Sequence, residues 1–149
     1  MLITAQDFLT QAKQLINGSE IPEVNSRTAV SRAYYSLFHQ SFEYLKKNHQ
    51  IKFAEKIKKE LDFGGGTDRV DYSLVNSLDR NYLNKLKINL HQIMGDVYAD
   101  IKMENQGMDF RNFRDERNKA DYSIQQDYPI VRARVTVTQI EVMINKLGM

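Results

Sequence analysis

The sequence predicts an all-α fold, an up-and-down bundle of about five or six helices. Apolar residues recur three and four positions apart along most of the chain, and Gly and Pro are few. The one stretch that alternates like a β-strand has no second strand to pair with. With 149 residues and 42% hydrophobic content, the chain is expected to form a single domain, residues 1–149, with a buried core.

Composition excludes several classes of protein. There is no cysteine, so neither a disulfide framework nor a thiolate metal site is available. No stretch approaches the roughly 20 apolar residues of a membrane span, and Gln6 and Asp7 interrupt any signal peptide. We therefore expect a cytoplasmic protein without membrane contact. The net charge of +2 is too small to indicate nucleic-acid binding by itself.

The stretch 27–39, Arg-Thr-Ala-Val-Ser-Arg-Ala-Tyr-Tyr-Ser-Leu-Phe-His, predicts a central helix that extends to about Asn48. Its buried stripe is predicted from helical spacing and comprises Val30, Ala33, Tyr34, Leu37, Ser41 and either Tyr44 or Leu45. The opposite stripe is polar and comprises Thr28, Arg32, His39, Glu43 and Lys46. One side of this helix is expected to pack, and the other is free to meet water or a partner.

An earlier helix is predicted from Thr4, which can cap it, to Gly18, which ends it. A third helix is expected from Ile51 to Phe63. Lysines gather in and just before this segment: Lys46, Lys47, Lys52, Lys56, Lys58 and Lys59. A solvated helix surface is the ordinary interpretation, and an RNA contact through Lys56 and Lys59 is the functional one.

The segment Gly64–Thr67 contains three glycines, but no Gly-Lys-Ser/Thr follows, so a phosphate-binding loop is not expected. From Asp71 to Ile101 the apolar residues keep helical phase, which predicts one long helix or two stacked helices. Gly95 weakens this pattern by about 1 kcal/mol without breaking it. Gly107 is expected to end the segment.

Arginines follow one another at three-residue spacing in the stretch from Phe110 to Tyr122. On a helix, Arg111, Arg114 and Arg117 would form a cationic ridge suited to bidentate phosphate contacts. The alternative is structural: Arg117 pairs with Asp121 one turn later, while Asp115 and Glu116 neutralise the other arginines.

The last segment has two interpretations. Residues 131–138 alternate apolar and polar side chains, as a strand does. A helix is favoured, because Asp127 can cap it, Pro129 suits its first turn, and an unbroken helical stripe follows: Ile130, Ala133, Val137, Ile140, Ile144 and Leu147.

Metal-dependent enzymes are not indicated. A di-iron bundle needs Glu-x-x-His pairs, and none of the three histidines has a Glu three residues before it. His39 and Glu43, one turn apart, are a weak pair that is more often a surface hydrogen bond. We therefore expect no metal site and no cofactor.

Two motifs carry a family resemblance: Ser31-Arg-Ala-Tyr-Tyr-Ser-Leu-Phe-His39 and, far downstream, Arg117-Asn-Lys-Ala-Asp-Tyr122 before a closing helix. In this order they resemble the small stand-alone proteins of the HEPN superfamily. The resemblance implies a helical bundle that is frequently a homodimer, with the arginine motif near the dimer cleft. It also implies RNA cleavage or binding in toxin–antitoxin or antiviral defence systems, often beside a nucleotidyltransferase or antitoxin protein.

The sequence departs from the active ribonucleases of that family at Tyr122. Those enzymes carry His four to six residues after the arginine, and the His is the base. A tyrosine with a pKa of about 10 is roughly 0.1% ionised at pH 7, whereas a histidine near 6.5 is mostly basic. Arg32 and His39 satisfy the spacing, but within the central helix rather than at the usual place.

We therefore expect a HEPN-like module that binds RNA or a nucleotidyltransferase-type partner. Arg117 would contact phosphate or partner, Asp121 would orient it, and Tyr122 would stack or hydrogen-bond. The candidate RNA-binding residues are Arg111, Arg114, Arg117, Lys119, Arg32, Lys56 and Lys59. One alternative is a metal-independent endoribonuclease that uses Arg117 with Tyr122 or His39, and another is an interaction subunit of a larger complex.

Overall fold

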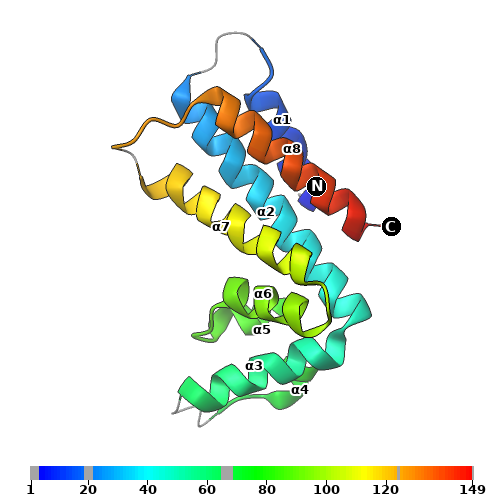
Figure 1. Ribbon diagram of the computed structural model, residues 1–149. Helices are drawn as coiled ribbons and strands as arrows, with labels where there is room; N and C mark the ends of the chain where they lie inside the picture. Colours follow the sequence, from blue (N-terminus) through cyan, green and yellow to red (C-terminus); the bar gives the residue numbers. More distant parts are fainter. Residues whose placement is uncertain (1–3, 19–21, 65–68, 124, 149) are drawn as a thin grey trace. The chain divides into compact units, whose positions relative to one another are not determined.

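The computed structural model describes residues 4–18, 22–64, 69–123 and 125–148, and all regular secondary structure in these ranges is helical (Figure 1). The helices are α1 (Ala5–Leu15), α2 (Glu23–Asn48), α3 (Gln50–Gly64), α4 (Tyr72–Asn76), α5 (Arg80–Lys85), α6 (Leu90–Asp100), α7 (Glu104–Tyr122) and α8 (Ile130–Leu147). The all-α prediction is confirmed. The expected five or six helices are too few, because eight lie in the described ranges.

The chain forms two compact units, and residues of α2 and α7 belong to both. Unit 1 comprises residues 1–41 and 109–149, and unit 2 comprises residues 42–108. The expectation of one domain over the whole chain stays a prediction. Among the described residues, no helix is both long enough and apolar enough to cross a membrane.

Unit 1 is a bundle built from α1, the first part of α2, the second part of α7, and α8. Thr4 begins α1 as predicted: its hydroxyl accepts from the backbone N–H of Asp7, and the Asp7 carboxylate accepts from the backbone N–H of Thr4. The predicted central helix is confirmed as α2. Its predicted apolar stripe is buried throughout: Val30, Ala33, Tyr34, Leu37 and Ser41.

The C-terminal segment is the helix α8, as favoured over a strand. Five residues of its predicted stripe are buried: Ala133, Val137, Ile140, Ile144 and Leu147. The predicted cap is wrong, because Pro129 occupies the N-cap position and makes no side-chain cap hydrogen bond. The proline ring fixes an extended backbone there, so the helix begins after it rather than after Asp127.

In unit 2, α3 confirms the helix predicted over 51–63. Its buried side chains are Phe53, Ala54, Ile57 and Leu61, and the Phe53 ring meets Phe42 edge-on at a centroid distance of 5.3 Å. The expectation about a phosphate loop concerns residues 64–67, of which 65–67 lie outside the described residues.

The prediction of one long helix or two stacked helices from Asp71 to Ile101 is wrong, because three helices, α4, α5 and α6, divide this stretch. Each begins at a side chain that accepts from the helix's own backbone N–H groups: Asp71 for α4, Asp79 for α5 and Asn89 for α6. Leu78, between α4 and α5, has a positive φ of 54° and is fully buried. Capping and burial of this leucine therefore override the continuous apolar periodicity.

Two glycines mark a close helix approach in unit 2. Gly95 lies within α6 without breaking it, as expected. Gly107 does not end the segment but lies in the first turns of α7, and the break falls earlier, at Lys102 with φ 63°. A Cβ at Gly107 would lie 3.2 Å from the Gly95 carbonyl oxygen, so glycine is what allows α6 and the start of α7 to touch.

Candidate functional site

The two sequence motifs meet in unit 1, where α7 packs on α2. The guanidinium carbon of Arg117 lies 5.3 Å from the centroid of the Tyr34 ring, a cation–π contact. The Arg117 side chain is only 14% exposed. Its Nη1 is 3.7 Å from Oδ2 of Asp121, so the expected pairing of these two residues along α7 is confirmed.

Asp121 also joins the two helices directly. Ser31 on α2 donates a hydrogen bond from Oγ to Oδ2 of Asp121, at 3.4 Å. The same carboxylate oxygen thus faces both Ser31 and the Arg117 guanidinium. Asp121 therefore contacts both Arg117 and Ser31, and its role in orienting Arg117 toward a ligand stays a prediction.

Two arginines in this site have unused hydrogen-bond donors. The Nε atoms of Arg114 and Arg117 are buried and have no hydrogen-bond partner within the described part of the chain. A guanidinium has five N–H donors in a planar fork, and a buried donor without an acceptor is costly. The pair is one turn apart on α7. Because the Nε atoms are buried, an acceptor from outside the chain would meet these guanidiniums at their Nη groups.

Tyr34 forms an apolar and uncharged wall beside both arginines. Burial raises the pKa of its phenol, and the nearby charges of Arg117 and Arg114 lower it by less. The ring is therefore neutral at physiological pH and does not offset either guanidinium. Among the described residues, the carboxylate in ion-pair contact with these two arginines is that of Asp121, 3.7 Å from Arg117.

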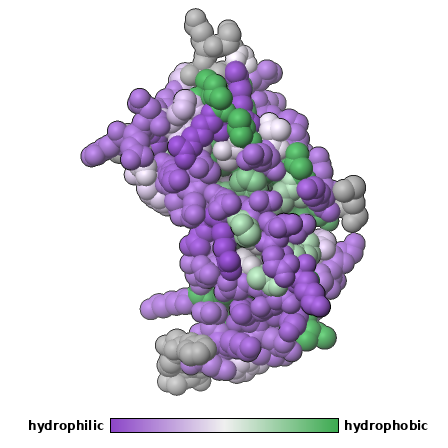
Figure 2. Space-filling view, viewed as in Figure 1, coloured by the Kyte–Doolittle hydropathy of each residue, from purple (hydrophilic) through white to green (hydrophobic). Residues whose placement is uncertain are grey.

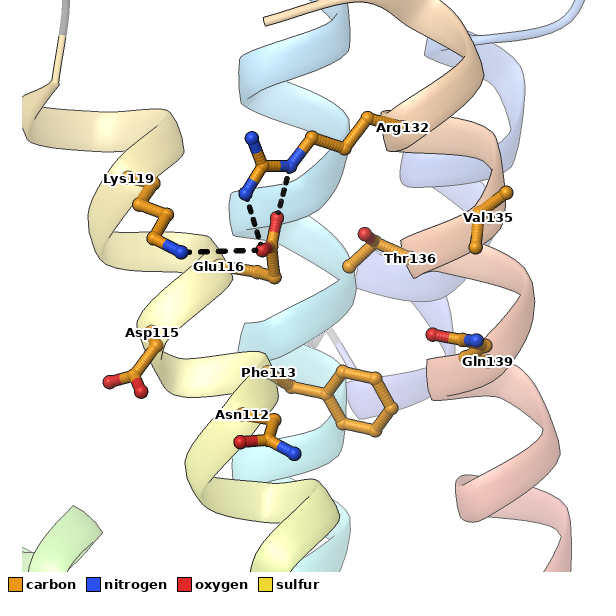
Figure 3. A pocket seen from close by; sticks show the side chains of 9 residues that line it. All are labelled: Asn112, Phe113, Asp115, Glu116, Lys119, Arg132, Val135, Thr136 and Gln139. Atoms are coloured by element: carbon orange, nitrogen blue, oxygen red, sulfur yellow. Dashed lines mark hydrogen bonds and ion pairs between the residues drawn. The ribbon is translucent and has the colours of Figure 1, made fainter.

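Glu116 does not neutralise these arginines, contrary to the structural alternative considered from the sequence. It accepts from Arg132 Nε at 2.9 Å and Nη2 at 2.6 Å, and from the Tyr128 hydroxyl at 2.8 Å. Figure 3 shows Arg132 of α8 reaching across to Glu116 of α7, with Lys119 on the other side at 3.9 Å. The Arg132 hydrogen bonds lower the pKa of Glu116 against the opposing effect of burial.

Arg27 shapes the site from the start of α2, and its importance was missed in the sequence. Its guanidinium donates to the carbonyls that follow one another at the end of α7, those of Lys119 at 3.3 Å and Ala120 at 2.9 Å, and further on to those of Ser123 and Gln126. The carbonyls of Lys119 and Ser123 also accept from the backbone N–H groups of Ser123, at 3.1 Å, and Gln126, at 3.2 Å. The arginine therefore adds a charged donor at the C-terminal end of α7. A signal existed: Arg27 precedes Ser31 and Tyr34 by one and two helical turns.

The remaining candidates in unit 1 lie in different places. Arg111 and Lys119 are exposed on α7. Arg32 lies over the Phe8 ring at 5.9 Å, and His39 stacks on the same ring with a centroid distance of 5.6 Å. At about 100° per residue, His39 lies about 140° around α2 from Tyr34, the residue that Arg117 covers.

Tyr122 ends α7 directly after Asp121, and 72% of it is exposed. Its ring is thus accessible to a partner. Lys56 and Lys59 belong to unit 2. Lys56 Nζ pairs with Oδ2 of Asp100 at 3.2 Å, whereas Lys59 is exposed.

Within the described residues, no three His, Asp or Glu side chains form a group that could hold a metal ion. Comparisons with protein-family models, with curated proteins and with solved structures find no match to this chain. The residues brought together where α7 packs on α2 are the two guanidiniums of Arg114 and Arg117, the Asp121 carboxylate and the Tyr34 ring. Such a set binds phosphate groups well.

Proposed function

We propose that this chain is a helical RNA-binding module of the HEPN type, which holds the RNA backbone through Arg114 and Arg117. The resemblance of the Ser31–His39 and Arg117–Tyr122 motifs supports the family. It also suggests a place in a toxin–antitoxin or antiviral defence system, with a nucleotidyltransferase or antitoxin protein as partner. Binding rather than cleavage is the activity that the residues of the site favour.

The observation that carries this proposal is the pair of guanidinium donors of Arg114 and Arg117, one turn apart on α7 and both close to the neutral ring of Tyr34. Phosphate oxygens accept such donors in the bidentate geometry that a guanidinium offers. Exposed Arg111 and Lys119 extend the positive charge along α7, while Tyr122 offers a ring on which a base can stack.

The endoribonuclease alternative has less support. His39 lies about 140° around α2 from the Arg117 contact, so the two side chains point to different sides of the helix. Tyr122, which is 72% exposed, stands where the active ribonucleases of the resembled family carry a histidine base. Binding requires neither a histidine beside Arg117 nor a basic group at position 122.

The test is binding of a labelled single-stranded RNA pool over a series of salt concentrations. We expect affinity to fall steeply with salt, because each neutralised phosphate releases a counterion. Arg114→Ala should reduce the salt slope by roughly one unit. Lys87→Ala, which removes an equal charge at an exposed position of unit 2, is the matched control and should leave the slope unchanged.

Two outcomes would contradict the proposal. One is the absence of RNA binding at low salt, which would favour an interaction subunit instead. The other is an equal effect of Arg114→Ala and Lys87→Ala, which would show that only the overall charge of the chain matters.

A further inference from the structure

Helix α8 has an apolar side that the bundle of unit 1 does not cover. Val131, Val135 and Val142 are 67%, 51% and 49% exposed. Figure 2 shows hydrophobic side chains following the course of α8 on the face in view. With the exposed Thr138 they recur at intervals of four, three and four residues, and we call these four residues the valine ridge.

The valine ridge lies opposite the core-facing side of α8. At about 100° per residue, its members fall within about 60° of one another. Valine is a poorer helix former than Ala, Leu, Lys or Glu, so a solvated surface gains nothing from three of them in line. An aligned and exposed apolar stripe of this kind is the mark of an interaction surface.

The spacing of the ridge residues, at intervals of four, three and four, is the same when the helix is followed from either end. About a midpoint between residues 136 and 137, Val131 corresponds to Val142, and Val135 corresponds to Thr138. Two such helices packed antiparallel would therefore place each outer valine against a valine and each inner residue against Val135 or Thr138. A surface that complements its own reverse is what a two-fold interface requires.

Grooves lie on both sides of the valine ridge and can receive side chains of a second helix that packs on the ridge. The groove between α7 and α8 has a volume of about 460 Å³, and Phe113, Val135, Thr136 and Gln139 are among the residues that line it (Figure 3). The groove between α1 and α8 has about 500 Å³, and Thr10, Gln14, Arg134 and Glu141 are among its lining residues. The walls of both grooves add contact area to that of the valine ridge. This matters because a stable interface covers roughly 800 Å² per partner.

We propose that the valine ridge is a self-association surface, on which α8 of a second copy of this chain packs antiparallel about a two-fold axis. The inference does not depend on RNA binding.

The first experiment measures mass by light scattering at high micromolar concentration. We expect twice the monomer mass of 17.4 kDa. Val135→Glu places a charge at the centre of the ridge and should return a monomer with unchanged helical circular dichroism. Ile51→Glu is the matched control: Ile51 is 76% exposed in unit 2, and its replacement should leave the dimer intact.

The second experiment tests the antiparallel register and uses the absence of cysteine from the chain. In the proposed dimer, residue 131 faces the partner's Val142 but lies about 16 Å along the axis from the partner's Val131. A disulfide needs Cα atoms within about 7 Å. Mild oxidation should therefore cross-link a mixture of the Val131→Cys and Val142→Cys proteins, but not either protein alone.

Three results would overturn the inference. A monomeric native protein at high micromolar concentration would show that a different partner covers the ridge. A dimer that survives Val135→Glu would place the interface elsewhere. Efficient cross-linking of the Val131→Cys protein with itself would show a parallel arrangement.

Discussion

The guanidinium of Arg117 lies over the ring of Tyr34, 5.3 Å from its centroid, and this contact joins two motifs that are far apart in the sequence. It places the cation against a neutral, buried phenol and leaves the Nε donor without an acceptor in the described chain. An arginine held in this way is preorganised, since less side-chain entropy is lost when a phosphate arrives.

We predict little or no RNA cleavage by the isolated protein. The assay is incubation with a mixed RNA pool in EDTA, which silences contaminating metal-dependent nucleases. Tyr122→His is expected to raise cleavage, because a base with a pKa near 6.5 would then occupy the position at which the resembled ribonucleases carry a histidine. Efficient cleavage by the native protein that both Arg117→Ala and Tyr122→Phe abolish would make the tyrosine catalytic; loss on His39→Ala alone would move the site to α2.

Arg27→Ala should destabilise the protein by roughly 2–3 kcal/mol, because the carbonyls of Lys119 and Ala120 at the end of α7 lose a charged donor. Urea unfolding followed by circular dichroism measures the change. Arg32→Ala is the control on the same helix: Arg32 is exposed, and its loss should cost no more than about 0.5 kcal/mol. Equal effects of the two changes would argue against the capping role.

Glu116→Gln should destabilise the protein at neutral pH but not in acid. The pKa of Glu116 is lowered in the folded state, chiefly by the Arg132 hydrogen bonds, so the unfolded state binds its proton more readily. The stabilisation is therefore fully present above the usual value of 4.5 and is lost as pH falls through the lower folded pKa.

The measurement is urea unfolding at pH 7 and at pH 3. A difference of roughly 1–2 kcal/mol at pH 7, from weakened charged hydrogen bonds, should shrink on acidification. Glu55→Gln, at an exposed position of α3, should show little difference at either pH. A Glu116→Gln effect of the same size at both pH values would mean that the carboxylate charge is not what matters.

Gly107→Ala should destabilise the protein by about 1 kcal/mol. The new Cβ would meet the Gly95 carbonyl oxygen and the Tyr98 Cβ, both at 3.2 Å, and neither can move without shifting a helix. The overpacking cost of roughly 1–3 kcal/mol exceeds the gain of about 1 kcal/mol in helix propensity. Gly148→Ala is the comparison, because its Cβ would meet only the Ile144 carbonyl oxygen at 3.6 Å, an ordinary contact. A lower stability of Gly148→Ala than of Gly107→Ala, measured by thermal unfolding, would contradict this account.

Local signals in the sequence were sufficient for the all-α class and for four helices of the fold. Thr4 marks the start of α1, and helical periodicity marks α2, α3 and α8, because caps and apolar stripes act within a few residues. The pairing of Arg117 with Asp121 also follows from spacing alone, since residues four apart lie on one helix face.

Local signals in the sequence did not predict the breaks between the helices from Asp71 to Ile101. Asp71, Asp79 and Asn89 resemble any other polar positions until burial of Leu78 makes the chain turn between α4 and α5. Gly107 likewise resembles a helix end, and only the approach of Gly95 shows that it serves packing. Periodicity reports which residues are buried, but not where the chain changes direction.

The candidate site divides in the same way. The sequence by itself determined which helices carry the motif residues and that Asp121 faces Arg117. Only the tertiary structure decided that Arg132 takes Glu116, that Arg27 caps α7, and that Arg114 and Arg117 keep free Nε donors beside Tyr34. These outcomes depend on contacts between α2, α7 and α8, and the partner of a charged side chain is set by which helices pack together.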